Sequence, residues 1–263
     1  MQVSLPMYGV SQDDVLPFWQ ALRGWLVKLG VKQVPHSLVW PEDLLDHWSD
    51  PNLLLSQTCG FPLVELLPDA NVVGVFSYQV AECEGPYYRS ILIARKDDIG
   101  KKLADFRHRK VAFNSKDSQS GYNTLRGLVA PLAEDGKFFA ESVASGSHYQ
   151  SIELVKQGAA DIAAIDCISL ELLRRANPDA LKGIKKVGET ALAPGLPLIT
   201  SAQTSPAQLA LLRQALRLTI EDPASAEARE KLLIKDFSVL PRSAYGAISE
   251  LKQQAAELGV MTL

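Results

Sequence analysis

Residues 111–129, VAFNSKDSQSGYNTLRGLV, combine an apolar start, a polar turn rich in serine and a second apolar segment. Residues 109–113 predict a short strand, and the apolar positions within 122–129 recur with the period of a helix. The polar turn between them places Ser118 and Ser120 in the first turn of that helix. The first N–H groups of a helix have no partner inside it, and the macrodipole adds positive potential there. The pattern therefore predicts a site for a small oxyanion, with N-capping by one of the serines as the alternative.

Other segments place polar residues beside predicted strands, where open α/β sheets form ligand crevices. Tyr88 opens an apolar strand. Ser147 and His148 begin a predicted helix, whose dipole keeps a histidine neutral, so we expect His148 to act as an N–H donor or else as a surface cap. Asp166 ends a predicted strand and offers an acceptor, which suits an amine or a protonated oxygen better than a fully ionised phosphate. Its alternative is capping of the next helix.

The first part of the chain offers a second set of candidates. Tyr8 follows a predicted strand and could stack on a ligand or close the edge of the sheet. Gln57, Thr58 and Cys59 lie between a predicted strand and a predicted helix, so this turn repeats the geometry of the serine turn. A helix cap is the alternative for these three residues.

Taken in chain order, these segments resemble the phosphonate/phosphate-binding family of ABC-transporter solute-binding proteins, over roughly residues 1–200. The resemblance implies the type II periplasmic-binding-protein fold. It also implies that a small oxyanion, such as a phosphonate, phosphate or phosphite, is bound without catalysis or a cofactor, and that an ABC permease is the partner. Gln119 departs from the family, which often has Thr there. The ligand-binding residues expected are Tyr8, Gln57, Thr58, Cys59, Tyr88, Ser118, Gln119, Ser120, Ser147, His148 and Asp166.

Predicted strands and helices alternate along the chain, which is typical of α/β folds with mostly parallel sheets flanked by helices. We interpret residues 87–94 and 194–200 as two crossover strands between two lobes. The expected division is lobe I over residues 1–88 plus 197–263 and lobe II over residues 89–196, with a hinged ligand cleft between them. The C-terminal helices are expected on lobe I. The predicted strands of lobe I are 2–5, 31–40, 52–56 and 71–78, and the predicted C-terminal helices are 205–220, 224–233 and 243–258.

Composition excludes several classes of protein. A net charge of −3 over 263 residues, without a long basic cluster, argues against nucleic-acid binding. Three cysteines and four histidines show neither disulfide nor metal spacing. Apolar runs fall short of the ~20 residues that a membrane span needs. The glycine-rich sequence motifs that bind the phosphates of nucleotides do not occur. We expect a monomer without a metal.

The N-terminus predicts no signal peptide, because the sequence enters its first strand directly. The protein is therefore expected to be periplasmic if an export signal was removed, and cytoplasmic if the sequence is full length. This leaves two alternatives to a transport protein. One is a cytosolic lyase or transferase on the same fold, with Cys59 or Cys167 beside His148 as nucleophile and base. The other is a cytosolic ligand sensor with a protein partner.

Overall fold

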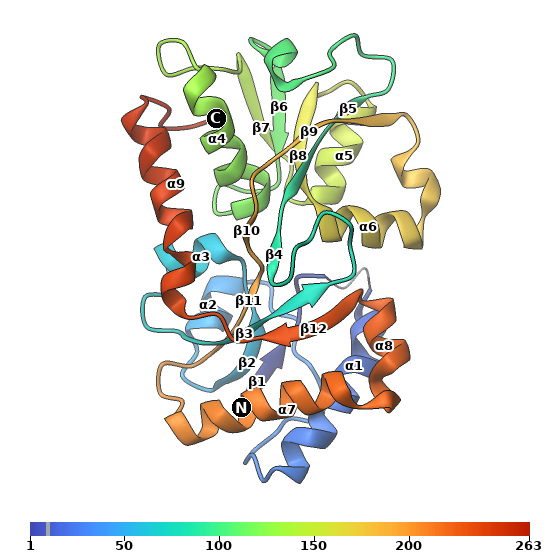
Figure 1. Cartoon of the computed structure of the whole chain (residues 1–263), viewed down its shortest axis with the longest axis vertical. Coiled ribbons are helices and arrows are strands. Elements are labelled where there is room, and N and C mark those ends of the chain that lie inside the picture. Colours follow the sequence, from blue (N-terminus) through green and yellow to red (C-terminus); the bar gives the residue numbers. More distant parts are fainter. Residues whose placement is uncertain (9–10) are drawn as a thin grey trace. The chain divides into compact units, whose positions relative to one another are not determined.

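The computed structural model describes residues 1–8 and 11–263. The chain forms two compact units, each containing one five-stranded sheet (Figure 1). The chain passes from one unit to the other within the short strands β4 (Tyr87–Tyr88) and β10 (Ala193–Pro194), which pair with each other, and again after Tyr245. Unit 1 comprises Met1–Tyr87 and Pro194–Tyr245, and unit 2 comprises Tyr88–Ala193 and Gly246–Leu263.

The sheet of unit 1 has the order β1-β2-β11-β3-β12. β1 and β2 are parallel, so the segments that follow them leave from the same edge of the sheet. β11 is antiparallel to both of its neighbours, and β12 is antiparallel to β3. The strands are β1 (Gln2–Ser4), β2 (Leu53–Gln57), β3 (Asn71–Tyr78), β11 (Pro197–Thr200) and β12 (Ile234–Ser238).

Helices of unit 1 bury apolar stripes against this sheet. α1 begins after Ser11, whose N–H donates to the Asp14 carboxylate in a capping box, and its Phe18 ring meets Phe76 of β3 edge to face at 5.6 Å. Arg213 of α7 donates to two backbone carbonyls of β3. The helices are α1 (Gln12–Lys28), α2 (Leu44–Ser49), α3 (Gly60–Glu65), α7 (Pro206–Glu221) and α8 (Ala226–Lys231), with short 3₁₀ turns at Pro223–Ser225 and Arg242–Tyr245.

The sheet of unit 2 has the order β7-β6-β8-β5-β9. β6 is parallel to both β7 and β8, whereas β5 is antiparallel to β8 and β9. The loops after β6, β7 and β8 therefore lie at one edge of the sheet. The strands are β5 (Ser90–Arg95), β6 (Lys110–Phe113), β7 (Glu141–Ala144), β8 (Ile162–Asp166) and β9 (Ile184–Glu189). The helices are α4 (Thr124–Val129), α5 (His148–Lys156), α6 (Cys167–Ala176) and α9 (Gly246–Glu257), with 3₁₀ turns at Leu103–Phe106, Ala130–Leu132 and Pro178–Leu181.

The α/β class is confirmed, but both sheets are mixed in strand direction. Neighbouring parallel strands need a long crossover, usually a helix. β5 and β11 instead each follow a two-residue strand without an intervening helix, and each runs against its neighbours. These are the strands that we expect to lie next to the connections between lobes.

Two elements of unit 1 differ from the sequence prediction. Residues 31–40 form turns rather than a strand, because Pro35 lacks an N–H donor and Gln33 adopts a positive φ of 56°. β12 is absent from the prediction, because Ile234–Ser238 alternates poorly and carries two charged residues. It is nevertheless an edge strand, where charged residues are common.

The C-terminal segment also differs from expectation, because residues 246–263 belong to unit 2. α9 lies along α4, as Figure 1 shows for the red and green helices. The close approach needs Gly127, since a Cβ there would lie 2.3 Å from Cδ1 of Leu251. Helical periodicity predicts the apolar face of α9 but not which surface that face covers.

Gly74 of β3 provides a test of the sheet of unit 1. A Cβ at Gly74 would lie 2.4 Å from ring atoms of Phe237 and 2.6 Å from the backbone oxygen of Ser238. We expect Gly74→Ala to lower the free energy of unfolding by about 1–3 kcal/mol, measured by urea denaturation. Gly24 in α1 has nothing within 4 Å of such a Cβ, so Gly24→Ala should raise it by about 0.5–1 kcal/mol. Equal urea midpoints for the two variants would contradict this packing of β12 on β3.

Candidate functional site

The serine turn of unit 2 is a π-helical turn, Gln119–Asn123, between β6 and α4. The Asn123 N–H donates to the Ser118 carbonyl at 3.0 Å, and the Ser118 Oγ accepts from the Gly121 N–H at 3.0 Å. The N-capping alternative is therefore confirmed for Ser118. Capping uses the Ser118 oxygen as an acceptor and leaves its O–H proton for another acceptor. Such wide turns are rare in helices and are frequent at functional sites.

Ser120 joins this turn to two neighbouring loops. Its Oγ lies 2.9 Å from Nε2 of His148 and 3.5 Å from Oγ of Ser118. Its carbonyl accepts from the hydroxyls of Ser90 on β5 and Thr124 on α4, each at 2.9 Å. Ser120 is thus fixed on both its side chain and its backbone.

His148 is a neutral imidazole at physiological pH, because burial lowers its pKa to about 4. This agrees with the neutral state that the sequence predicts, and burial is a cause of it that the sequence does not reveal. Within the described residues Nδ1 is buried without a hydrogen-bond partner. An orphaned buried N–H is rarer than an orphaned acceptor, so the ring proton belongs on Nε2, which then donates to the Ser120 Oγ. The Ser120 hydroxyl proton then points away from His148, and the contact of Ser120 with a ligand stays a prediction.

Gly121 is required by the packing of the turn. A Cβ at Gly121 would lie 1.9 Å from Oδ1 of Asn114 and 3.3 Å from Cε1 of His148. A side chain at this position would therefore push apart the loops after β6 and β7.

Ser147 and Asp166 both act as helix caps, which is the alternative reading of Asp166. Ser147 Oγ accepts from the Gln150 N–H at 3.1 Å at the start of α5. Buried Asp166 accepts with Oδ1 from two N–H groups at the start of α6, at 2.8 and 3.1 Å. Asp166 stands opposite Ser90 in the β5–β8 register, and Ser90 reaches the Ser120 carbonyl. The pairing of β5 with β8 therefore places Asp166 beside the serine turn. The contact of Asp166 with a ligand stays a prediction.

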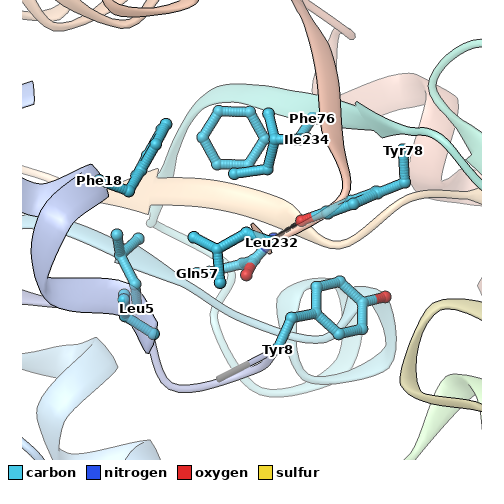
Figure 2. A pocket seen from close by; sticks show the side chains of 9 residues that line it. Leu5, Tyr8, Phe18, Gln57, Phe76, Tyr78, Leu232 and Ile234 are labelled. Atoms are coloured by element: carbon cyan, nitrogen blue, oxygen red, sulfur yellow. Dashed lines mark hydrogen bonds between the residues drawn. The ribbon is translucent and has the colours of Figure 1, made fainter. Parts of the chain in front are cut away.

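In unit 1, Tyr8 and Gln57 line a small cavity at the edge where β1 and β2 end (Figure 2). Gln57 Nε2 donates to the Tyr78 hydroxyl at 3.1 Å, and the Tyr8 ring meets the Tyr78 ring edge to face at 5.0 Å. The apolar side chains of Phe18 and Phe76 also line this cavity. The cavity of about 20 Å³ has room for roughly one water molecule. Tyr8 and Gln57 therefore hold Tyr78 in place.

Thr58, Cys59 and Tyr88 are buried side chains. The Thr58 N–H donates to the Pro197 carbonyl at 3.0 Å, which fixes the turn after β2. That these three residues contact a ligand stays a prediction. Within unit 2, His148 forms its hydrogen bond with Ser120, so the geometry of this unit does not single out a pair of Cys167 and His148.

The residues that support Gln119 are absent from the sequence prediction. Asn123 Nδ2 donates to Gln119 Oε1 at 2.8 Å, and Arg126 in turn donates to Asn123 Oδ1 at 3.3 Å. The spacing of four and then three residues puts these side chains on one helical face, which is the signal that could have found them.

Metal-binding clusters and membrane-spanning helices are both absent from residues 1–8 and 11–263. Within them, groups of three or more His, Cys, Asp or Glu side chains that could hold a metal ion do not occur. Among the helices of this part of the chain, none is long and apolar enough to cross a membrane.

The chain resembles several solved structures throughout its length. A binding-protein component of an ABC phosphonate transporter from Pseudomonas aeruginosa has 19% identity and a TM-score of 0.78, over 98% of this chain and 87% of that one. PhnD1 from Prochlorococcus marinus, in complex with methylphosphonate, has 16% identity and a TM-score of 0.77, over 97% and 98%. A Xanthomonas citri protein bound to ATP has 16% identity and a TM-score of 0.74, over 98% of both chains. These similarities show the type II periplasmic-binding-protein fold.

Sequence comparisons give the family directly. A search of curated proteins found no match. The family model described as the phosphonate periplasmic substrate-binding protein of ABC transporters matches residues 53–245, well over half of the chain. This family consists of non-catalytic substrate-binding proteins. The chain therefore belongs to the family of periplasmic substrate-binding proteins of ABC phosphonate transporters.

Proposed function

We propose that this protein binds a small phosphorus oxyanion, a phosphonate, phosphate or phosphite, for an ABC uptake system. The observation that carries the proposal is the cluster of Ser118, Ser120 and neutral His148 at the start of a helix. Its hydroxyl protons and the first-turn N–H groups are donors, and oxyanions are acceptors. The methylphosphonate bound to the Prochlorococcus protein supports this class of ligand.

Neutral donors suffice for useful affinity. Hydrogen bonds to a charged group contribute about 1.5–3 kcal/mol each, so four or five of them give micromolar or tighter binding after the entropy cost. In this proposal Asp166 meets a protonated ligand oxygen or an amine, because a second ionised oxygen would be repelled. Gln57, Thr58, Cys59 and Tyr88 complete the ligand contacts, as the family resemblance implies, together with Tyr8, which follows a strand end.

We further propose that the protein works as a monomer and delivers its ligand to an ABC permease in the periplasm. The family is periplasmic and serves ABC transporters, which supports both the partner and the location.

An enzymatic role is less well supported by the same geometry. The Ser120–His148 pair has the 2.9 Å separation of a nucleophile and its base. A catalytic imidazole needs a third group that orients its other nitrogen, and within the described residues Nδ1 of His148 has no such partner. The pair is therefore suited to holding a hydroxyl toward a ligand.

The first test is a calorimetric titration with phosphate, phosphite, methylphosphonate, 2-aminoethylphosphonate, sulfate, malate and ATP. We expect one or more phosphorus oxyanions to bind. Ser120→Ala should weaken this binding about 10- to 100-fold, because one charge-assisted hydrogen bond is lost. Ser37→Ala, at an exposed serine of unit 1, is the matched control and should bind like the wild type. Binding that is unchanged in Ser120→Ala, or confined to malate, would contradict the proposal.

The second test is the pH dependence of stability. The unfolded chain protonates His148 below the ordinary histidine pKa of 6.5, whereas the folded chain does so only below a pKa of about 4. The contribution of neutral His148 to the free energy of unfolding should therefore be complete above pH 6.5. It should fall as the pH falls toward 4, by at most about 3 kcal/mol.

His148→Gln removes the titrating group and keeps an N–H donor. The difference in unfolding free energy between wild type and variant, measured by urea denaturation, should change across pH 4–6.5 and level off above it. Parallel curves throughout this range would show that His148 is not held neutral by burial.

A further inference from the structure

A second and larger cavity of unit 1 is lined by the end of β3, the loop that follows it and the edge strand β12. Its volume of about 370 Å³ is within the range of small-molecule pockets, whereas the cavity beside Tyr8 has room for roughly one water molecule. Ser77, Gln79, Lys235 and Asp236 are among its lining residues, and the residues that line it all belong to unit 1. Unit 1 therefore forms this cavity by itself.

The loop that closes one side of the cavity is fixed at both ends by backbone hydrogen bonds. At its start, the Gln79 N–H donates to the Leu233 carbonyl at 2.7 Å, which joins the loop to the chain just before β12. At its end, Glu84 and Tyr87 exchange two backbone hydrogen bonds of 3.0 and 3.1 Å. The cavity is thus a preformed feature of the fold, as most small-molecule sites are.

An irregularity in β12 brings two charged residues to this one cavity. Neighbouring residues of a regular strand point to opposite faces of the sheet. β12 lies beside β3 (Figure 1), but its register shifts between Ile234 and Asp236, so Lys235 is an extra residue in the ladder. Lys235 and Asp236 both line the cavity, and Asp236 stands opposite Ser77 in the register. Such bulges re-aim side chains and are over-represented next to active sites.

The fold itself does not use these two charges. Among the residues that the structure describes, neither Lys235 nor Asp236 forms an ion pair. Oδ1 of Asp236 accepts from the Phe237 N–H at 2.7 Å, which leaves Oδ2 for another donor. Ser77, in the same wall, has a hydroxyl that can both donate and accept. The cavity therefore presents a cation, an anion and a hydroxyl.

We infer that this cavity is a binding site for a small zwitterion, whose acidic group meets the Lys235 ammonium and whose own ammonium meets the Asp236 carboxylate. A ligand with one charge gains one attraction and suffers one repulsion, whereas a zwitterion gains two attractions. Both side chains are exposed, so solvent screens these attractions, and we expect dissociation constants on the order of a millimolar. The inference goes beyond the proposed function and does not depend on the serine turn.

The test is an NMR titration of the isotope-labelled protein with β-alanine, taurine and 2-aminoethylphosphonate. These zwitterions share a 2-aminoethyl group and carry a carboxylate, a sulfonate and a phosphonate, so they also identify the acidic group that is preferred. Propionate and propylamine each lack one of the two charges. We expect the amide signals of residues 77–85 and 235–236 to shift with at least one zwitterion, and much less with propionate or propylamine at the same concentration.

Variants locate the binding. Lys235→Met and Asp236→Asn should each raise the dissociation constant of the zwitterion about three- to tenfold, as for one screened charge-assisted contact. Lys32→Met and Asp69→Asn remove the same charges at exposed positions of unit 1 and are the matched controls, which should bind like the wild type. The same shifts should persist in Ser120→Ala, which separates this site from the serine turn.

Equal shifts with the ligands of one charge, or wild-type binding by both Lys235→Met and Asp236→Asn, would overturn the inference. Loss of the shifts in Ser120→Ala would also overturn it, as would their absence with all three zwitterions at about ten times the expected dissociation constant. If a variant does not fold, the comparison of the zwitterions with propionate and propylamine decides. Failure of phosphorus oxyanions to bind would contradict the proposed function and leave this inference standing.

Discussion

The hydrogen bond between Ser120 and His148 is the interaction on which the arrangement of unit 2 depends. It joins the loop after β6 to the loop after β7, and the Ser120 backbone is tied through Ser90 to β5. The parallel strands β6, β7 and β8 supply the common edge at which these loops meet. A bond of 2.9 Å between side chains 28 residues apart therefore needs the whole sheet to be in register. Glycine at 121 keeps that meeting point open.

The sequence predicts the parts of this arrangement that are local. The period of 122–129 and the serines before it are enough to place a helix start, and Asp166 at a strand end is enough to predict a cap or an acceptor. The π-helical turn is not predictable in this way, because its extra residue is fixed by the bonds of Ser118 and Asn123 rather than by periodicity. Thr124 belongs to the same turn through its bond to the Ser120 carbonyl.

Longer-range features are harder to predict, for a physical reason. α9 has an ordinary amphipathic pattern, and the missing side chain at Gly127 and the hydrogen bond from Arg126 help to make α4 its partner. β12 escapes prediction because an edge strand tolerates charge. The roles of Tyr8 and Gln57 stay open at the level of sequence for a similar reason, since Tyr78, which both of them contact, is far away in the chain. The family resemblance implies the fold and a ligand-facing turn at Gln57, but it does not predict the contacts with Tyr78.

The C-terminal segment gives the binding turn a support that the sequence does not suggest. The Leu263 N–H reaches the Tyr122 hydroxyl at 3.4 Å, and Arg126 holds the Met261 carbonyl. Tyr122 packs in turn on Phe113 at the end of β6, with ring centroids 4.9 Å apart. The last residues of the chain thus brace the turn from one side, while His148 holds it from another. If the turn binds the ligand as proposed, this bracing holds its donors in position before the ligand arrives, which lowers the ordering cost of binding.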